Sequence, residues 1–206
     1  MDKNALKSFA MDAREKLTNL MKVKLQDLHI EEDLHFTQHG DLYENTEHVL
    51  RAMSASDYER YNKLKSAVSR DGIKAIIEKS AYTWFNRIVA IRYMEVNNFL
   101  PLGPNFESLD IKVLCDKSGK DFRNPEIMTM SKLRETSLDI DYAKLPEMND
   151  PEKYKTIILA IVKKLGEAIP DVFDGDTENI DGLIPDNLLL PNGLNICFFF
   201  AIFYFL

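Results

Sequence analysis

The histidines are the first side chains in this sequence that could bind a metal ion. His35 and His39 are four residues apart, with His29 and His48 nearby, and two histidines at this spacing share one face of a helix. A zinc site needs further nitrogen, sulfur or carboxylate ligands. The run HFTQHG contains a glycine, and no cysteine or acidic residue lies at a useful spacing. We therefore expect no metal site among the histidines.

An acidic cluster near the end of the chain is the second candidate. Asp174, Asp176 and Glu178 match the first three ligand positions of a calcium-binding loop. Such a loop requires glycine at position six and a bidentate glutamate at position twelve. These positions hold Asn179 and Pro185, so we expect no calcium site.

Residues 80–101 combine the only tryptophan with two arginines and a glutamate in one helix's length of sequence. The 3.6-residue period places Trp84, Ile88 and Ile91 on one apolar stripe, with Phe85 and Val89 beside it. This pattern predicts a buried helix. Asn86, Arg87, Arg92 and Glu95 are expected on or beside its flank, with Arg92 in reach of Glu95 across three residues.

Three runs of the sequence resemble one enzyme family. They are AYTWFNRIVAIRYMEVNNFLP at 81–101, MDKNALKSFAMDAREKLTNLMKVK at 1–24 and LGEAIPDVFDGDTENIDGLIPDNLL at 165–189. All three are similar to the amino-terminal region of PglX-type adenine-specific DNA methyltransferases. These are the modification enzymes of BREX phage-defence systems and relatives of type IIG restriction-modification enzymes. The resemblance gives a structural family signature: Trp84, Phe85, Asn86, Arg87, Arg92, Glu95 and Asn97.

By this resemblance, the full-length enzyme methylates an adenine that is flipped out of double-stranded DNA, with S-adenosylmethionine as the methyl donor. That chemistry needs a glycine-rich cofactor loop and an Asn-Pro-Pro-Tyr-like motif. The eight glycines are never closer than seven positions, and the sole Asn-Pro pair, Asn124-Pro125, is followed by Glu126 and Ile127. We therefore expect no catalytic residue, cofactor site or methyltransferase Rossmann domain in this chain, which alone should be inactive.

The charge distribution gives little general attraction to DNA. The net charge is −7, and residues 165–206 hold seven acidic and no basic residues, so residues 1–164 carry 26 of each sign. DNA affinity normally comes from clustered lysines and arginines. A weak DNA contact is expected only at Lys16, Lys22 and Lys24; the alternative is a solvated helix face.

The rest of the sequence predicts a mainly α fold: a helical bundle with a long irregular crossing, which is a segment without regular structure that joins two helices. Helices are expected from about Asn4 to Leu28, from Ser54 or Ser56 to Gly72, from Ile73 to before Pro101, and from Asp150-Pro151 to Pro170. Residues 29–45 are expected to connect two helices. Residues 109–114 alternate like a strand, but no second strand of similar quality appears, so a sheet is not expected.

The sequence suggests three segments. They are a helical amino-terminal domain at 1–170, an acidic exposed linker at 171–194 and an anomalous hydrophobic tail at 195–206. The run ICFFFAIFYFL at 196–206 is too short to span a bilayer. A frameshift or premature stop is the favoured explanation, and a membrane tether or a packing element are the alternatives.

Together these observations predict the non-catalytic front part of a methyltransferase. It would brace the methyltransferase domain or dock another BREX subunit, and meet DNA through the full enzyme. The alternative is a stand-alone helical interaction or regulatory protein. The two cysteines, Cys115 and Cys197, lie in dissimilar contexts without a secretory signal, so we expect no disulfide and a cytoplasmic location without membrane contact.

Overall fold

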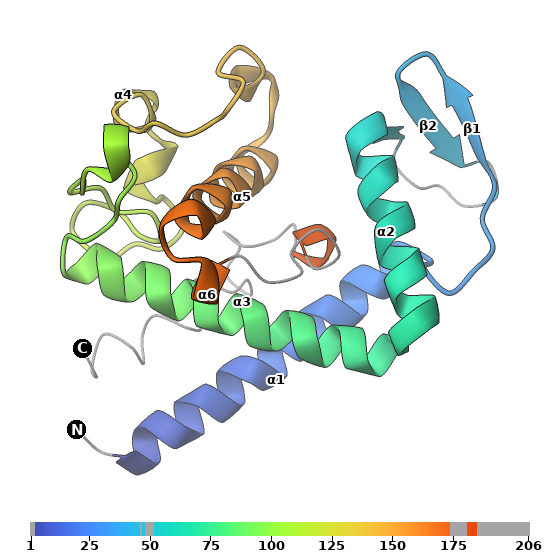
Figure 1. Cartoon of the computed structure of the whole chain (residues 1–206), viewed down its shortest axis with the longest axis horizontal. Helices are drawn as coiled ribbons and strands as arrows, with labels where there is room; N and C mark the ends of the chain where they lie inside the picture. The colour runs from blue at the N-terminus through green and yellow to red at the C-terminus, as the bar shows by residue number, and fades with distance from the viewer. Residues whose placement is uncertain (1–2, 46, 48–51, 174–180, 185–206) are drawn as a thin grey trace.

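The computed structural model describes residues 3–45, 47, 52–173 and 181–184 (Figure 1). Within this part the chain forms six α-helices and one small three-stranded sheet, so the predicted mainly α fold is confirmed. The helices are α1 (Lys3–Asp27), α2 (Ala55–Asp71), α3 (Ile73–Val96), α4 (Met130–Leu133), α5 (Asp150–Ala168) and α6 (Pro170–Phe173).

Helices α1 and α3 cross and share the centre of the molecule (Figure 1). Helix α1 buries one side chain per turn, namely Ala13, Leu17, Met21 and Leu25. From α3, the predicted stripe of Trp84, Ile88 and Ile91 is buried. Burial of such stripes removes apolar surface from water and is the main source of stability in a helical domain.

Glycine separates α2 from α3, as the sequence predicts. Gly72 has φ 83°, a conformation that a side chain would strain, and its N–H donates to the carbonyl of Val68 at the end of α2. The long helix α3 stops at the predicted Asn97-Asn98 break. The Gly72 boundary turns α2 away from α3, so that α2 projects beside the crossing helices (Figure 1).

The cap residues confirm one prediction and correct another. Ser54 caps α2 by accepting from the N–H of Asp57, so the cap is Ser54 rather than Ser56. Helix α5 is capped by Asn149, whose side chain accepts from the N–H of Glu152. The sequence placed this cap at Asp150, but Asp150 is the first helical residue, where its charge still faces the positive helix end.

A β-hairpin replaces the simple connection predicted for residues 29–45. Strand β1 (Phe36–His39) pairs with β2 (Leu42–Asn45), and β2 pairs with the two-residue β3 (Met53–Ser54), all antiparallel. Gly40 opens the two-residue turn with φ 61°. The prediction that a sheet is absent is therefore wrong.

The irregular crossing runs between α3 and α5, as predicted, and contains only short turns of helix. These are η1 (Pro104–Phe106), η2 (Glu126–Met128), α4 and η3 (Leu145–Glu147). Residues 109–114 form no strand, although Ile111, Val113 and Leu114 are buried. Their alternation reflects packing against the core rather than pairing in a sheet.

Part of the segment predicted to be an exposed acidic linker is buried where the structure describes it. Helix α6 buries Phe173, and the short helix η4 (Asp181–Leu183) is followed by Ile184, with Leu183 and Ile184 both buried. η4 contacts α1 and α2. Asp171 and Asp181 therefore lie within three residues of side chains that belong to the core. Residues 174–180 and the predicted tail at 195–206 lie outside the described part.

Candidate functional site

The family signature lies mostly inside the molecule rather than on a cleft. Trp84, Arg87, Arg92 and Glu95 are buried, Phe85 and Asn86 are half-buried, and Asn97 is exposed at the end of α3. The side-chain amide of Asn97 donates to the carbonyl of Tyr93, at 2.8 Å. The three charged residues were expected on the flank of α3; the structure corrects this, because all three are less than 4% exposed.

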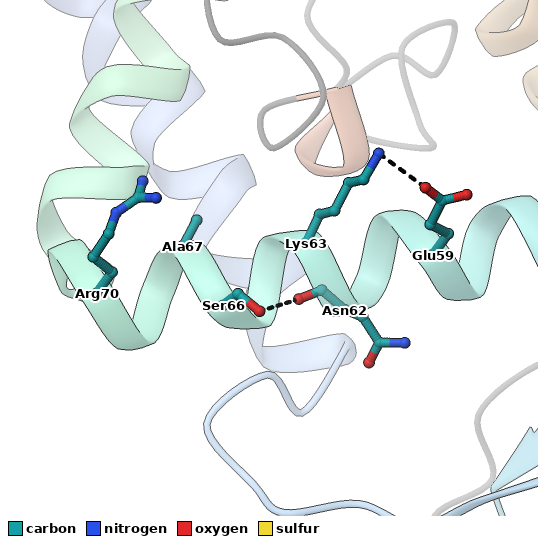
Figure 2. A pocket seen from close by; sticks show the side chains of 6 residues that line it. All are labelled: Glu59, Asn62, Lys63, Ser66, Ala67 and Arg70. Atoms are coloured by element: carbon teal, nitrogen blue, oxygen red, sulfur yellow. Dashed lines mark hydrogen bonds and ion pairs between the residues drawn. The ribbon is translucent and has the colours of Figure 1, made fainter.

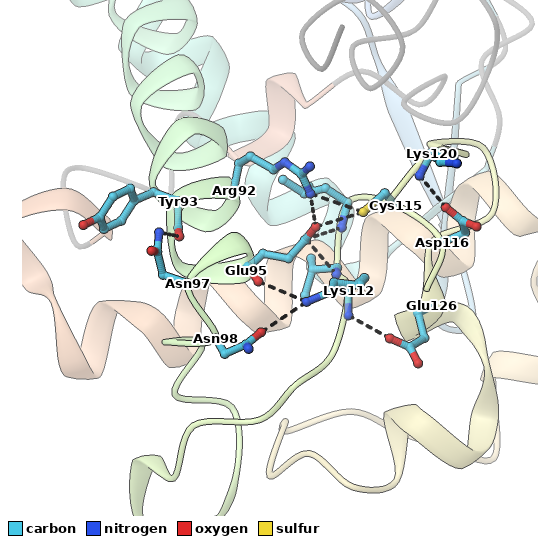
Figure 3. A network of polar contacts seen from close by, with 12 residues as sticks. Arg92, Tyr93, Glu95, Asn97, Asn98, Lys112, Cys115, Asp116, Lys120 and Glu126 are labelled. Atoms are coloured by element: carbon cyan, nitrogen blue, oxygen red, sulfur yellow. Dashed lines mark hydrogen bonds and ion pairs between the residues drawn. The ribbon is translucent and has the colours of Figure 1, made fainter. Parts of the chain in front are cut away.

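Glu95 is the centre of a buried polar network between α3 and the irregular crossing (Figure 3). Arg92 donates from Nη1 to Oε1 of Glu95, which confirms the predicted i,i+3 pair. The other oxygen, Oε2, accepts the backbone N–H groups of Val113 and Leu114, each at 2.9 Å. The carboxylate therefore replaces the partner strand that residues 113 and 114 lack.

Lys112 and Tyr154 secure the same loop from its other sides. Lys112 Nζ donates to the backbone carbonyl of Glu95 at 3.2 Å (Figure 3). It also pairs with Asp110 at 3.0 Å. From α5, the Tyr154 hydroxyl donates to the carbonyl of Val113 at 3.1 Å. The loop is thus held between α3 and α5 by hydrogen bonds to its own backbone, as buried irregular chain requires.

Cys115 completes the network as a neutral thiol. Its Sγ donates to Glu95 Oε1 at 3.0 Å, and Arg92 Nη1 lies 3.3 Å from the sulfur. Burial, the charge of Glu95 and this hydrogen bond raise the pKa of Cys115 to about 12. Since the thiolate is the nucleophilic form, Cys115 is held in its unreactive state. The network as a whole positions backbone and presents no activated group.

A second buried cation, Arg87, joins α3 to the end of the described chain. Its Nη1 donates to Asp181 Oδ1 and its Nη2 to the carbonyl of Phe173, both at 2.9 Å. Its guanidinium carbon also lies 5.0 Å from the centre of the Trp84 ring. Burial raises the pKa of Asp181 above its usual range, and the nearby Arg87 charge opposes this shift.

Sequence reasoning identified Arg87, Arg92 and Glu95 but missed their partners. Cys115 and Asp181 are 20 and 94 residues away from the side chains they bind. The available signal was the position of three charged residues on an otherwise apolar helix, because buried charges need partners. That signal predicts that partners exist without saying where in the sequence they are.

The predicted lysine patch is not a single surface. Lys16, Lys22 and Lys24 all lie on α1, where Lys16 and Lys22 are exposed and Lys24 is half-buried. Helical geometry turns about 100° per residue, so Lys22 and Lys24 are about 160° apart around the axis. Lys16 and Lys24 are about 80° apart, and only this pair can meet one partner surface.

Two of the histidines considered as metal ligands pair with acidic side chains instead. Within the described ranges, no group of three or more histidine, cysteine or acidic residues could hold a metal ion. His29 pairs with Glu32 at 2.7 Å, and His35 with Glu47 at 3.3 Å. The acidic cluster at Asp174 to Glu178 lies outside the described residues.

A shallow open hollow on α2 is also part of the helix surface (Figure 2). It is lined by Glu59, Asn62, Lys63, Ser66, Ala67 and Arg70. Lys63 pairs with Glu59 at 3.0 Å, and Ser66 donates to the carbonyl of Asn62 at 2.8 Å. These are contacts between successive turns of one helix, so the hollow is a solvated helix face without convergent groups.

No helix in the described part of the chain is both long and apolar enough to cross a bilayer. The longest helices, α1 and α3, both carry several charged residues.

Comparison with known proteins finds two relatives with the same activity in their names. An adenine-specific methyltransferase PglX of Lacticaseibacillus casei (strain Zhang) is 36% identical over 124 residues, which cover 55% of this chain and 10% of that protein. An adenine-specific methyltransferase BrxX of Escherichia coli O9:H4 (strain HS) is 27% identical over 202 residues, which cover 91% of this chain and 16% of that protein.

No protein-family model matches the chain. The matched residues span less than a fifth of each relative, so most of both enzymes has no counterpart in this sequence. The match to BrxX nevertheless extends over nearly the whole chain, and the resemblance seen in the sequence is confirmed: the chain is related to the PglX and BrxX adenine-specific methyltransferases.

Proposed function

We propose that this chain is a non-catalytic helical segment of an adenine-specific DNA methyltransferase of the BREX or restriction-modification type. In the whole enzyme it would stand at the amino-terminal side, brace the methyltransferase domain or dock another BREX subunit. Catalysis with S-adenosylmethionine would belong to the remainder. The relation to PglX and BrxX supports the assignment to this type of enzyme.

The proposed scaffold role rests on one observation: most side chains of the family signature are buried and bind other parts of this chain. A catalytic or ligand-binding signature places polar groups around a pocket with perturbed pKa values. Here Arg92 and Glu95 bind Cys115 and the backbone of residues 113 and 114, and Arg87 binds Phe173 and Asp181. These bonds fix the path of the chain.

The residues present do not fit S-adenosylmethionine. A methyltransferase holds this cofactor at a glycine-rich turn between a strand and a helix of a parallel sheet, where backbone can approach the ligand. The sheet in the described part is a three-stranded antiparallel one. The sequence as a whole has no glycine-rich run and no Asn-Pro-Pro-Tyr-like motif.

DNA would be met through the full enzyme. Residues 1–164 are formally neutral, so this segment adds little to the electrostatic affinity for phosphate. Direct contacts between this segment and DNA would be limited to the lysines of α1, of which Lys16 and Lys24 can face one surface. We place DNA methylation by the full enzyme in the cytoplasm, where host DNA is modified.

Three measurements test the proposal. Isothermal titration of the purified chain with S-adenosylmethionine should show no saturable heat, and a methylation assay on adenine-containing duplex DNA should show no transfer. Saturable binding at micromolar cofactor would contradict the non-catalytic role. The third measurement uses BrxX. Deleting the region of BrxX that matches this chain should abolish DNA methylation, although the catalytic motifs of BrxX remain. Full methylation by that deletion variant would exclude the scaffold role.

A further inference from the structure

One face of α3 carries large apolar side chains that the described chain leaves in solvent. Tyr82 is 53% exposed, Tyr93 50% and Val96 44%, and Phe99, just beyond the helix, is 58% exposed. We name these four residues the α3 stripe. They are four of the nine large hydrophobic side chains that are exposed in the described part of the chain. Contiguous exposed apolar surface usually marks a contact with another segment or molecule.

Helical geometry places Tyr82, Tyr93 and Val96 of the stripe on one side of α3. Tyr93 lies three turns after Tyr82 and only about 20° from it around the axis, and Val96 lies about 40° to the other side. Tyr93 points away from the Glu95 network (Figure 3). Among the described residues, Arg14 of α1 lies over the Tyr82 ring, 4.9 Å from its centre, and contacts only this end.

The α3 stripe lies on the side of α3 opposite Arg87, which binds the end of the described chain at Asp181. Arg87, which binds Asp181, is about 140° from Tyr82 around the helix axis. It is also only six residues, or about 9 Å along the axis, from Tyr93. The chain that follows Asp181 therefore starts from the middle of α3, on the side opposite the stripe.

We propose that the apolar run at residues 196–206 binds the α3 stripe. The run contains five phenylalanines and no charged residue, so its chemistry matches the aromatic and aliphatic surface of the stripe. Packing the two together would remove apolar area from water on both sides, at about 25 cal/mol per Å². Aromatic side chains on both partners also allow edge-to-face contacts.

The connecting chain is long enough for this contact. Eleven residues separate Ile184 from Ile196, and an extended chain of that length spans up to about 36–40 Å. The whole of α3 is about 36 Å long and 10–12 Å across. The run can therefore pass from the fastened side of α3 around to the stripe without disturbing the Arg87–Asp181 contact.

A disulfide test exploits the cysteine that the run already contains. Cys115 is buried, so Cys197 can pair only with a cysteine placed on the surface. With Val96→Cys in the stripe, mild oxidation should give an intramolecular disulfide to Cys197, identified by peptide mapping. Ser69→Cys on the exposed face of α2 is the matched control, because η4 also contacts α2. We expect Val96→Cys to react at least tenfold faster than Ser69→Cys.

Equal rates for the two positions would overturn the proposal. In the Val96→Cys variant, a disulfide from the new thiol to Cys197 of another molecule would also overturn it, since a second copy would then occupy the stripe. A measurement without new cysteines gives an independent answer. Removing residues 195–206 should increase nitration of Tyr82 and Tyr93 several-fold while the circular dichroism spectrum stays helical; unchanged nitration would contradict the contact.

Discussion

Helices α2 and α3 are neighbours in sequence but use charged residues in opposite ways. On α2, Lys63 and Glu59 pair on the surface, 37% and 68% exposed. On α3, Arg92 and Glu95 pair at 3% and 1% exposure, and Glu95 also binds the backbone of the crossing. Surface pairs contribute little because water competes with them. Buried pairs are costly to break, so they select one path for a loop that lacks secondary structure.

The strongest test of this comparison removes the buried carboxylate. Glu95→Ala leaves Arg92 charged and buried and removes the acceptor of two backbone N–H groups. We expect the free energy of unfolding to fall by about 3–5 kcal/mol, measured by urea denaturation followed by circular dichroism. A loss below about 1 kcal/mol would show that the carboxylate does not hold the crossing.

A double variant separates the charge pair from the backbone contacts. In Arg92→Met with Glu95→Leu, no buried charge is left unpaired, and such replacements are often neutral or stabilising. Here the N–H groups of Val113 and Leu114 would still lose their acceptor. We expect a remaining loss of about 1–3 kcal/mol for each unsatisfied group. A fully stable double variant would reduce the network to an ordinary ion pair.

Trp84→Ala should have an effect of similar size through packing alone. Trp84 is 1% exposed, and its removal from the α3 core should cost about 3–5 kcal/mol. In the unmodified chain its fluorescence emission should be blue-shifted. Trp84→Phe keeps most of the volume and serves as the control. Emission like that of tryptophan in water, with an unchanged melting temperature in Trp84→Ala, would refute this placement.

The turn at residues 116–121 should give a smaller, pH-dependent effect. The Ser118 hydroxyl and the N–H groups of Lys120 and Asp121 donate to the Asp116 carboxylate. The Ser118 hydrogen bond is the largest of the causes that lower the pKa of Asp116 from 3.8 to about 2. Since the folded pKa is lowered, this stabilisation is present above pH 4 and is lost as the pH falls toward 2.

Asp116→Asn should therefore flatten the acid limb of the stability curve between pH 4 and 2. Urea midpoints measured at several pH values test this. Asp12→Asn is the control, because it alters an exposed aspartate on α1, outside the turn. An identical acid limb in Asp116→Asn and the unmodified chain would contradict the role of the carboxylate.

The smallest effect is expected on α2. Lys63→Ala removes a partner of Glu59 from a solvated surface, and i,i+4 pairs of this kind are worth about 0.2–0.5 kcal/mol. The melting temperature should shift by only a degree or two. A change comparable with Glu95→Ala would end the distinction between the two helices.

The sequence predicted the long elements because their signals are local. The buried stripe of α5, from Tyr154 to Leu165, the Gly72 boundary and the end of α3 at Asn97 all follow from periodicity and capping. The hairpin was missed because its strands are four residues long and mostly exposed. Strand β1 shows no alternation of burial, and the alternation in β2 extends over only four residues.

The contacts of the crossing and the burial within the acidic segment could not be predicted for a different reason. Residues 109–114 alternate like a strand, but the hydrogen bonds of Val113 and Leu114 go to a side chain from α3. In the acidic linker, Leu183 and Ile184 are buried beside charged neighbours. Both outcomes depend on contacts between residues far apart in sequence, which neither propensity nor local charge reveals.

The bonds of Arg87 also set an order of events during synthesis. Its partners Phe173 and Asp181 lie 86 and 94 residues later in the chain. At a translation rate of about 5–20 residues per second, Asp181 follows Arg87 from the ribosome by roughly 5–20 s. During that interval α3 is complete but its guanidinium must remain hydrated. Closure over Arg87 is therefore a late step, and the nascent helix stays open on that face until the acidic segment arrives.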